Sequence, residues 1–378
     1  MGFADTDKPT TQRISTFMQT AKFAHPNPSF YVELKKRTNE YFKNTGKDTT
    51  GGRQLLVKAS ILVLLLVATY VAVVFFTPAS AVAALLLCVL LGLATAAVGF
   101  NVMHDGNHGS FSNNRIVNRI AANTAEFVGA SQFMWNMKHN VIHHAYTNID
   151  GIDDDIDAKP FLRMAPTQKK YKMHKYQHYY FWVFYAILHI FWTFFSDFKK
   201  YFTKKIGETP LKKMKPKDHF EFWAFKVAYF CLFVVIPVVR LGWQEWLIGF
   251  LAFTLTAGLV LSFVFQLAHT VEDTKFPVPQ KPMNTLEDEW AVHQLKTTAN
   301  FAVNNKLVSW YVGGLNFQVE HHLFPRISHI HYPAINKIIK QACKEYDVTY
   351  IEYDKVLQAI SSHIGFLKQM AKEDQVAA

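Results

Sequence analysis

The sequence contains too little cysteine to form a cysteine-based framework. Only three cysteines occur in 378 residues, Cys88, Cys231 and Cys343, and no two of them form a CxxC pair. This excludes a disulfide-stapled fold and a cysteine-ligated zinc or iron–sulfur site. Histidine, by contrast, occurs 17 times. Any metal chemistry in this chain must therefore use histidine ligands.

Charged residues are also scarce, at 18% of the chain, whereas 50% of the residues are hydrophobic and 15% aromatic. The formal net charge of +11 suits an anionic membrane surface, an acidic protein partner or nucleic acid. Nucleic acid is the least favoured of these, because the lysines flank apolar stretches and form no separate basic domain. The polar N-terminal region also lacks the apolar core of a signal peptide.

Four apolar stretches approach the ~20 residues that are needed to cross a bilayer core. They cover residues 59–76, 81–102, 222–239 and 246–268. Short breaks join the first two and the last two, which predicts two transmembrane hairpins. Residues 179–195 form a further apolar stretch that is very aromatic.

The lysine-rich segment 199–217 decides how this fifth stretch is interpreted. If residues 179–195 crossed the membrane, the eight lysines of this segment would lie outside, against the positive-inside tendency. An interfacial helix over 179–195 keeps the lysines inside and suits the Trp and Tyr content. We therefore predict an all-α integral membrane protein with four transmembrane helices in two hairpins, cytoplasmic termini and a cytoplasmic helical cap.

Three histidine clusters lie outside the predicted spans: HDGNH at 104–108, HNVIHH at 139–144 and QVEHH at 318–322. His269 stands at the end of the fourth span. Residues three or four apart share one helix face, so each cluster could turn its side chains toward one metal site. Eight histidines and one glutamine exceed the four ligands of a tetrahedral zinc site and are sufficient for two metals. Imidazole ligands and a membrane location together indicate redox metals that activate oxygen on a lipid.

These three motifs resemble the histidine boxes of the membrane fatty acid desaturases, which hold a di-iron centre. The segment GGLNFQVEHHLFP at 313–325 is similar to the front-end (QxxHH) subgroup of acyl-lipid and acyl-CoA Δ6/Δ5 desaturases and sphingolipid Δ8 desaturases. The resemblance extends from about residue 55 to 340. It implies a desaturase domain at 54–345, preceded by a polar segment at 1–53 and followed by a cytoplasmic tail at 346–378.

The resemblance also implies two Fe²⁺ ions and a set of ligands. The expected ligands are His104, His108, His139, His143, His144, His269, His321 and His322. Gln318 occupies a position where other branches of the family have histidine, and we expect it either to bind iron weakly or to act through water.

Metal-bound imidazoles usually donate their other N–H group to a carboxylate or carbonyl. The residues that we expect to orient the ligands in this way are Asp105, Glu320, Asp155 and its neighbours Asp153 and Asp154, and Asn316. A solvated loop is the alternative for the three aspartates. Trp135 and Asn140 are expected to pack beside the site, and His293, His329 and His331 to be structural.

Many front-end desaturases carry a fused cytochrome b5 domain with an HPGG haem motif, but this chain has only His25-Pro26-Asn27-Pro28. We therefore expect a separate ferredoxin or cytochrome b5 as electron donor, attracted by the basic face, although the lysines could equally bind anionic lipid. The active site is expected on the cytoplasmic face of a bacterial inner membrane or the endoplasmic reticulum.

The resemblance implies an O2-dependent enzyme that introduces a cis double bond into a long-chain acyl group linked to CoA or lipid. A fatty acyl or sphingoid hydroxylase is the nearest alternative, because it would use the same iron site. A histidine-rich metal transporter is a third possibility, but it requires ionisable residues within the spans. Apart from Lys226, the four predicted spans contain few charges, which disfavours transport.

Overall fold

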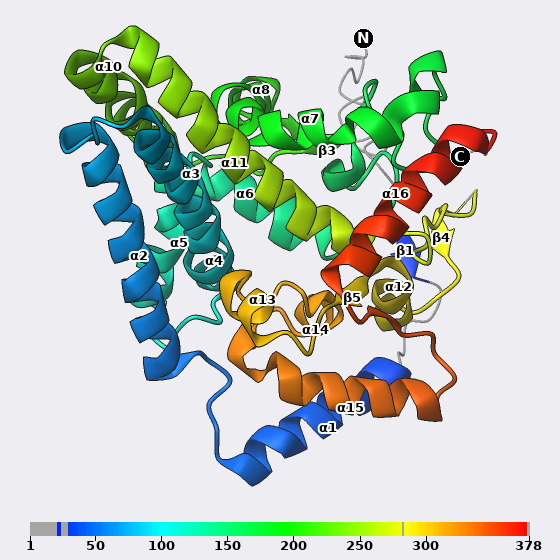
Figure 1. The fold of residues 1–378 in the computed structure, drawn as a ribbon. Coiled ribbons are helices and arrows are strands. Elements are labelled where there is room, and N and C mark those ends of the chain that lie inside the picture. Colours follow the sequence, from blue (N-terminus) through cyan, green and yellow to red (C-terminus); the bar gives the residue numbers. More distant parts are fainter. Residues whose placement is uncertain (1–20, 24–28, 282, 376–378) are drawn as a thin grey trace, which may run out of the picture.

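The computed structural model describes residues 21–23, 29–281 and 283–375, and it is mostly helical (Figure 1). The tetrapeptide at 25–28 lies outside the described residues. Three short strand pairs accompany the helices, which the all-α prediction did not include. They are β1 (Lys22–Phe23) with β4 (Thr285–Leu286), β2 (Lys205–Ile206) with β3 (Thr209–Pro210), and β5 (Ala299–Phe301) with β6 (Ile351–Tyr353).

Five continuous helices among the described residues are long and apolar enough to cross a membrane: Gly52–Phe75, Ala81–His108, Lys172–Thr203, Pro216–Leu241 and Trp243–His269. Four of them contain the predicted spans and are longer than the apolar runs. The remaining one, Lys172–Thr203, contains the stretch expected to be interfacial. Length and composition therefore give five candidate spans where the sequence analysis predicts four.

Several of these helices are interrupted by π-helical turns. Their segments are α2 (Gly52–Phe75), α3 (Ala81–Val98), η1 (Gly99–Met103), α4 (His104–His108), η4 (Lys172–Tyr176), α7 (Gln177–Phe191), η5 (Trp192–Ser196), α8 (Asp197–Thr203), α9 (Pro216–Phe230), η6 (Cys231–Val235), α10 (Ile236–Leu241) and α11 (Trp243–His269). Of these, η1, η5 and η6 are π-helical and η4 is a 3₁₀ turn.

Helix α11 packs against both α3 and α7 at positions where a side chain is missing. A Cβ on Gly92 of α3 would lie 2.6 Å from the Phe253 carbonyl oxygen of α11. A Cβ on Gly258 of α11 would collide with the Ala186 carbonyl oxygen of α7. Glycine therefore permits two close helix contacts, and both hold α11 near the histidine clusters.

The cap consists of shorter elements around the lower ends of these helices (Figure 1). They are α1 (Ser29–Thr45), α5 (Arg115–Val128), α6 (Gln132–Asn136), η2 (Met137–His143), η3 (Asp154–Ile156), α12 (Trp290–Thr297), α13 (Lys306–Tyr311), α14 (Gln318–Leu323), η7 (His329–His331), α15 (Tyr332–Glu345) and α16 (Val356–Lys372).

Both ends of the described chain belong to the packed structure. Phe30 and Leu34 of α1 are buried in one cluster with Leu323 of the third histidine box and Ile335 of α15. Phe366 of α16 is buried with residues of α7, including Phe181 and Tyr185. Helices α1 and α16 therefore help to hold the cap together.

Candidate metal centre

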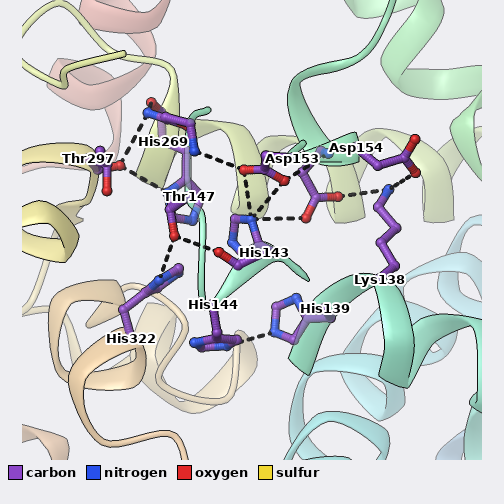
Figure 2. Close-up of polar contacts among 12 residues, drawn as sticks. Lys138, His139, His143, His144, Thr147, Asp153, Asp154, His269, Thr297 and His322 are labelled. Atoms are coloured by element: carbon purple, nitrogen blue, oxygen red, sulfur yellow. Dashed lines mark hydrogen bonds and ion pairs between the residues drawn. The ribbon is translucent and has the colours of Figure 1, made fainter. Parts of the chain in front are cut away.

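The structure brings the three histidine boxes and His269 together in one buried cluster. Figure 2 shows the part of it that contains the second box, His269 and His322. Eight of the nine predicted ligands are buried, and His108 is half-buried. A solvated role for these histidines is therefore excluded. Neutral imidazoles in such a site need partners for both ring nitrogens.

Seven of the histidines form two groups in which the potential ligand atoms lie within 4.8 Å of one another. The first histidine group contains His104, His108, His139 and His321, and the second contains His143, His269 and His322. A further set, His139, His143 and Asp155, connects the two groups.

His144 lies between the two histidine groups. Its ring centroid is 4.6 Å from that of His321 and 4.5 Å from that of His322. Its Nε2 atom lies 3.2 Å from Nε2 of His139.

The second box differs from the expected α-helical arrangement because it is a π-helical turn, η2. The His144 N–H donates to the His139 carbonyl at 3.1 Å, five residues earlier. This wider turn pairs His139 with His144, and it sends His139 and His143 to different groups. π-Helical turns of this kind are frequent at functional sites.

The third box also divides between the groups. The sequence pattern suggests that Gln318, His321 and His322 point the same way, but the structure places His321 in the first group and His322 in the second. Successive residues on a helix point about 100° apart, so neighbouring histidines can reach two metal positions. Gln318 is buried, and its Nε2 atom has no hydrogen-bond partner among the described residues.

Each histidine of the second group has one ring nitrogen held by an acceptor. Nδ1 of His143 lies 3.0 Å from Oδ2 of Asp153, and Nδ1 of His322 lies 2.8 Å from Oε1 of Gln294. Nδ1 of His269 lies 3.2 Å from the Thr297 carbonyl oxygen. These contacts leave Nε2 of all three rings without a hydrogen-bond partner among the described residues.

Besides Asp153, two of the predicted supporting residues, Asp155 and Asp105, lie close to ligands. Asp155 has a carboxylate oxygen 3.3 Å from Nδ1 of His143 and also pairs with Lys138. Asp105 lies 3.8 Å from Nδ1 of His104, beyond hydrogen-bond distance. Its other oxygen lies 3.0 Å from Nδ1 of His329. His329 therefore braces the first box and is absent from both histidine groups.

Glu320 and Asn316 do not make the contacts with ligands that the sequence analysis expected. The Glu320 carboxylate accepts hydrogen bonds from Asn300, Asn336 and Tyr350. Asn316 donates to the Ala302 carbonyl and to Ser309. These hydrogen bonds hold Glu320 of α14 and the preceding Asn316 against other parts of the cap, and none of them joins either side chain to a ligand ring. Glu320 and Asn316 therefore hold the third box in place. The spacing of residues in the sequence cannot distinguish this role from direct support of a ligand.

Sequence reasoning missed Gln294, Thr147, Thr297 and Tyr332. Thr147 donates to Gln294 at 2.9 Å, and the Tyr332 hydroxyl lies 3.2 Å from Nδ1 of His321. Gln294 and Thr297 are one turn apart on α12, but nothing in that sequence distinguishes them from surface polar residues. Trp135 stacks on His139 with a centroid distance of 4.4 Å, as its expected packing role requires.

Burial lowers the pKa of His139, His144, His321 and His322 well below the usual range, and the neighbouring imidazoles add to this effect. His143 is different: burial lowers its pKa, but the carboxylates of Asp153 and Asp155 raise it more, so that its net shift is upward. Neutral imidazoles with free lone pairs are the form that binds metals.

The unpartnered ring nitrogens are the test of whether this site fits a metal. Nε2 of His104, His108 and His321 in the first group also lacks a hydrogen-bond partner among the described residues. Buried polar atoms are rarely left unsatisfied in native proteins. The donors of both groups are imidazoles, which suit iron, and two groups suit two ions. The residues present therefore fit a di-iron centre.

A polar cleft of about 700 Å³ reaches the first group at His108. Asn107, Gln132 and the buried carboxyl of Glu126 line it. Burial raises the pKa of Glu126 to about 8. The cleft connects the first group with the polar surface of the cap.

Known proteins resemble this chain over most of its length. The sequence model of the family described as fatty acid desaturase matches residues 79–354. The chain is 35% identical over 351 residues to an sn-1 linoleoyl-lipid 6-desaturase of Arthrospira platensis, covering 92% of this chain and 94% of the relative. It is 37% identical over 341 residues to an enzyme of the same name from Synechocystis sp., with 90% and 94% covered.

A third relative, an acyl-lipid (8-3)-desaturase of Physcomitrium patens, is 36% identical over 349 residues, which cover 91% of this chain and 72% of the relative. The family match includes all three histidine boxes and His269. The buried histidine clusters agree with it in chemistry. This chain belongs to the fatty acid desaturase family and is an oxidoreductase that desaturates fatty acyl chains.

Proposed function

We propose that this desaturase uses two iron ions and O2 to introduce a cis double bond into an acyl chain that is carried by a membrane lipid, at a front-end position of the Δ6/Δ5 type. The observation that carries the iron proposal is the pair of buried histidine groups whose ring nitrogens lack other partners. The names of the relatives, linoleoyl-lipid 6-desaturase and acyl-lipid (8-3)-desaturase, support a lipid-linked substrate and a front-end position.

His104, His108, His139 and His321 would hold one iron, and His143, His269 and His322 the other. His144, whose ring lies near both His321 and His322, and Gln318 are the remaining candidate ligands. Bound iron would supply the activation of O2 and the removal of hydrogen from an unactivated methylene. Overall, one O2, two donor electrons, two protons and two hydrogens from the acyl chain would give two waters and one double bond.

The surrounding residues orient and shield the ligands. Asp153, Gln294 and the Thr297 carbonyl hold the rings of the second group in one tautomer each, with Nε2 available as ligand. Trp135 and Phe265 contact the ring of His139, at centroid distances of 4.4 and 6.1 Å. These apolar rings would limit the access of bulk water to the first group.

We further propose that the desaturase domain comprises residues 54–345, that α7 lies in the membrane interface, and that four helices span the membrane with the site on the cytoplasmic side. The positive-inside tendency supports this arrangement, because it retains the lysines at 199–217 in the cytoplasm. The same basic face would attract a separate acidic ferredoxin or cytochrome b5. The cyanobacterial relatives support a bacterial membrane.

The proposal can be tested by expressing the chain in a host that is fed linoleoyl substrates. Mass spectrometry of the lipid extract should show a new front-end double bond, appearing first in intact membrane lipids. His322→Ala should abolish it, whereas His178→Ala, which alters a histidine outside both groups, should retain it. Three results would contradict the proposal: a hydroxylated product, a double bond that appears first in the acyl-CoA pool, or a His322→Ala variant that still forms the double bond.

A further inference from the structure

An apolar groove of about 260 Å³ is lined entirely by hydrophobic or aromatic side chains. One of them, Leu267, lies two residues before the predicted ligand His269. Helix α11 contributes Val260 and Phe263, α13 contributes Val308 and Tyr311, and α16 contributes Ile360. The function described above does not use this groove. Its elements come from a candidate span and from two cap helices, so it lies where the cap meets the membrane-spanning helices (Figure 1).

Helix α13 is hydrogen-bonded to the candidate span Ala81–His108 well before the end of that helix. The Tyr311 hydroxyl donates to the Leu93 carbonyl oxygen at 2.9 Å, and Asn101 donates to the Tyr311 carbonyl at 2.8 Å. Leu93 lies eleven residues before His104, or about 16 Å along a helix. This part of the chain after His269 therefore packs beside an apolar helix.

The outer rim of the groove exposes large apolar side chains. Leu307 of α13 is 82% exposed, Trp310 is 47% exposed, and Leu357 of α16 is 75% exposed. Leu307 and Trp310 are three residues apart and share one helix face. This apolar rim stands beside a candidate span, because Nζ of Lys58 on α2 lies 5.2 Å from the Trp310 ring centroid, and a tryptophan is typical of the membrane interface.

Two aromatic rings separate the groove from the first histidine group. Tyr311 contacts Phe100 at a centroid distance of 6.4 Å, and Phe100 contacts Phe265 at 6.5 Å. Phe265 in turn contacts the His139 ring at 6.1 Å. Phe100 is 1% exposed and is therefore buried between the groove residue Tyr311 and Phe265. Rotation of these two side chains would connect the groove with the metal centre.

We propose that the groove between α11, α13 and α16 binds the acyl chain of a bilayer lipid and is the lateral entrance through which the substrate chain reaches the metal centre. The inference rests on the proposed lipid-linked substrate. A chain that remains attached to a bilayer lipid can enter sideways without leaving the hydrocarbon phase, so no apolar surface needs to be exposed to water. The polar cleft at His108 offers no such apolar path.

Chain binding at the groove can be tested without turnover. Holoenzyme would be placed in nanodiscs of phosphatidylcholine whose acyl chains either carry bromine or do not. The fluorescence of Trp310 is the tryptophan fluorescence of the wild type minus that of the Trp310→Phe variant. We expect brominated chains to quench this signal by at least half. Equal fluorescence in both kinds of nanodisc would place α13 outside the bilayer and overturn the inference.

The entrance role is tested by narrowing the groove. Val260→Trp from the span side and Val308→Phe from the cap side should each lower the rate of double-bond formation in membrane lipids by about tenfold or more. The iron content and elution volume of both variants should match those of wild type, which excludes misfolding. Val260→Ile and Leu64→Trp are the controls. Val260→Ile makes only a small change in the groove. Leu64→Trp adds a tryptophan to α2 outside the groove, at a residue that is 67% exposed.

The outcomes separate the two proposals. If wild type is active and both narrowed variants retain its rate with full iron content, the lateral entrance is wrong and the proposed function stands. If wild type itself produces no double bond in lipids, the proposed function fails, and the bromine quenching still decides whether the groove takes a lipid chain.

Discussion

The two histidine groups differ in how the protein holds them. In the second group, a carboxylate, an amide oxygen and a backbone carbonyl each accept from one ring nitrogen at 2.8–3.2 Å. In the first group, Asp105 lies 3.8 Å from His104, and a tyrosine hydroxyl lies 3.2 Å from His321. The second group is therefore oriented before any metal binds, whereas the first has weaker support.

This difference has consequences for metal affinity. Acceptors behind a ligating imidazole fix its tautomer and raise its basicity, and their loss typically costs 10–100-fold in affinity. The carboxylate behind His143 belongs to the loop after the second box, whereas Gln294 and Thr297 lie on α12. The second group should consequently bind its iron more tightly, and the first should lose iron earlier during dilution or chelation.

The largest effect is expected from removing one ligand of either group. His321→Ala and His322→Ala should each lower desaturation by about 100-fold or more, because a ligand loss exceeds the cost of losing its support. The comparison predicts different metal contents: His321→Ala should retain close to one iron, held by the second group. Iron analysis and product analysis of both variants measure this. Equal loss of both irons from the two variants would show that the groups do not bind independently.

Asp153→Asn should have the next largest effect. The change removes the negative charge behind His143, and we expect iron affinity of the second group to fall by about 10–100-fold. Asp157→Asn is the matched control, because Asp157 pairs with the exposed Lys159 and contacts no ligand. Competition with a chelator measures the affinity. If Asp153→Asn binds iron like wild type, the carboxylate does not contribute to the second group.

Gln294→Leu should weaken the second group by about tenfold, since Nδ1 of His322 loses its acceptor. Gln294→Glu retains an oxygen there and should bind iron nearly as well as wild type. Tyr332→Phe, which removes the corresponding partner of His321, should have less effect, on the order of 1 kcal/mol. If Tyr332→Phe lost more iron affinity than Gln294→Leu, the first group would depend on its support more than the second, which contradicts the proposed difference.

The smallest effect concerns the pH dependence of the iron-free protein. Burial lowers the pKa of His139, His144, His321 and His322, so the unfolded chain binds protons that the folded chain does not. The folded state should therefore lose stability as the pH falls below about 6.5, the value in unfolded chains. The raised pKa values of His143, Glu126 and Glu320 act in the opposite direction, but they are three groups against the four histidines.

Thermal unfolding at pH 8 and pH 5.5 measures this effect, with a lower melting temperature expected at pH 5.5. The dependence should become shallower in the double variant His321→Gln/His322→Gln. A melting temperature that is higher at pH 5.5 would contradict the assigned direction.

The sequence was sufficient for the parts of the fold and site that depend on strong local patterns. The apolar runs predicted four of the five candidate spans as membrane spans and the fifth as an interfacial helix, and the boxes predicted a cluster that includes His269. What failed depended on backbone detail. The π-helical turn η2 puts His139 in the first group and His143 in the second. No residue preference in MKHNVIH predicts a π-helical turn.

Tertiary contacts account for the remaining misses. Gln294 approaches His322 only because α12 packs beside α14, and Glu320 is held by Asn300, Asn336 and Tyr350 from elsewhere in the cap. These contacts join residues that are up to 30 positions apart. Spacing within a single box carries no information about them.

The metal content of the purified wild-type protein tests the central claim most directly. The two histidine groups predict two irons per chain when the protein is purified from iron-supplied cells, measured by elemental analysis against protein concentration. A content near one zinc per chain without iron would contradict the di-iron centre, and with it the division of the histidines into two metal-binding groups.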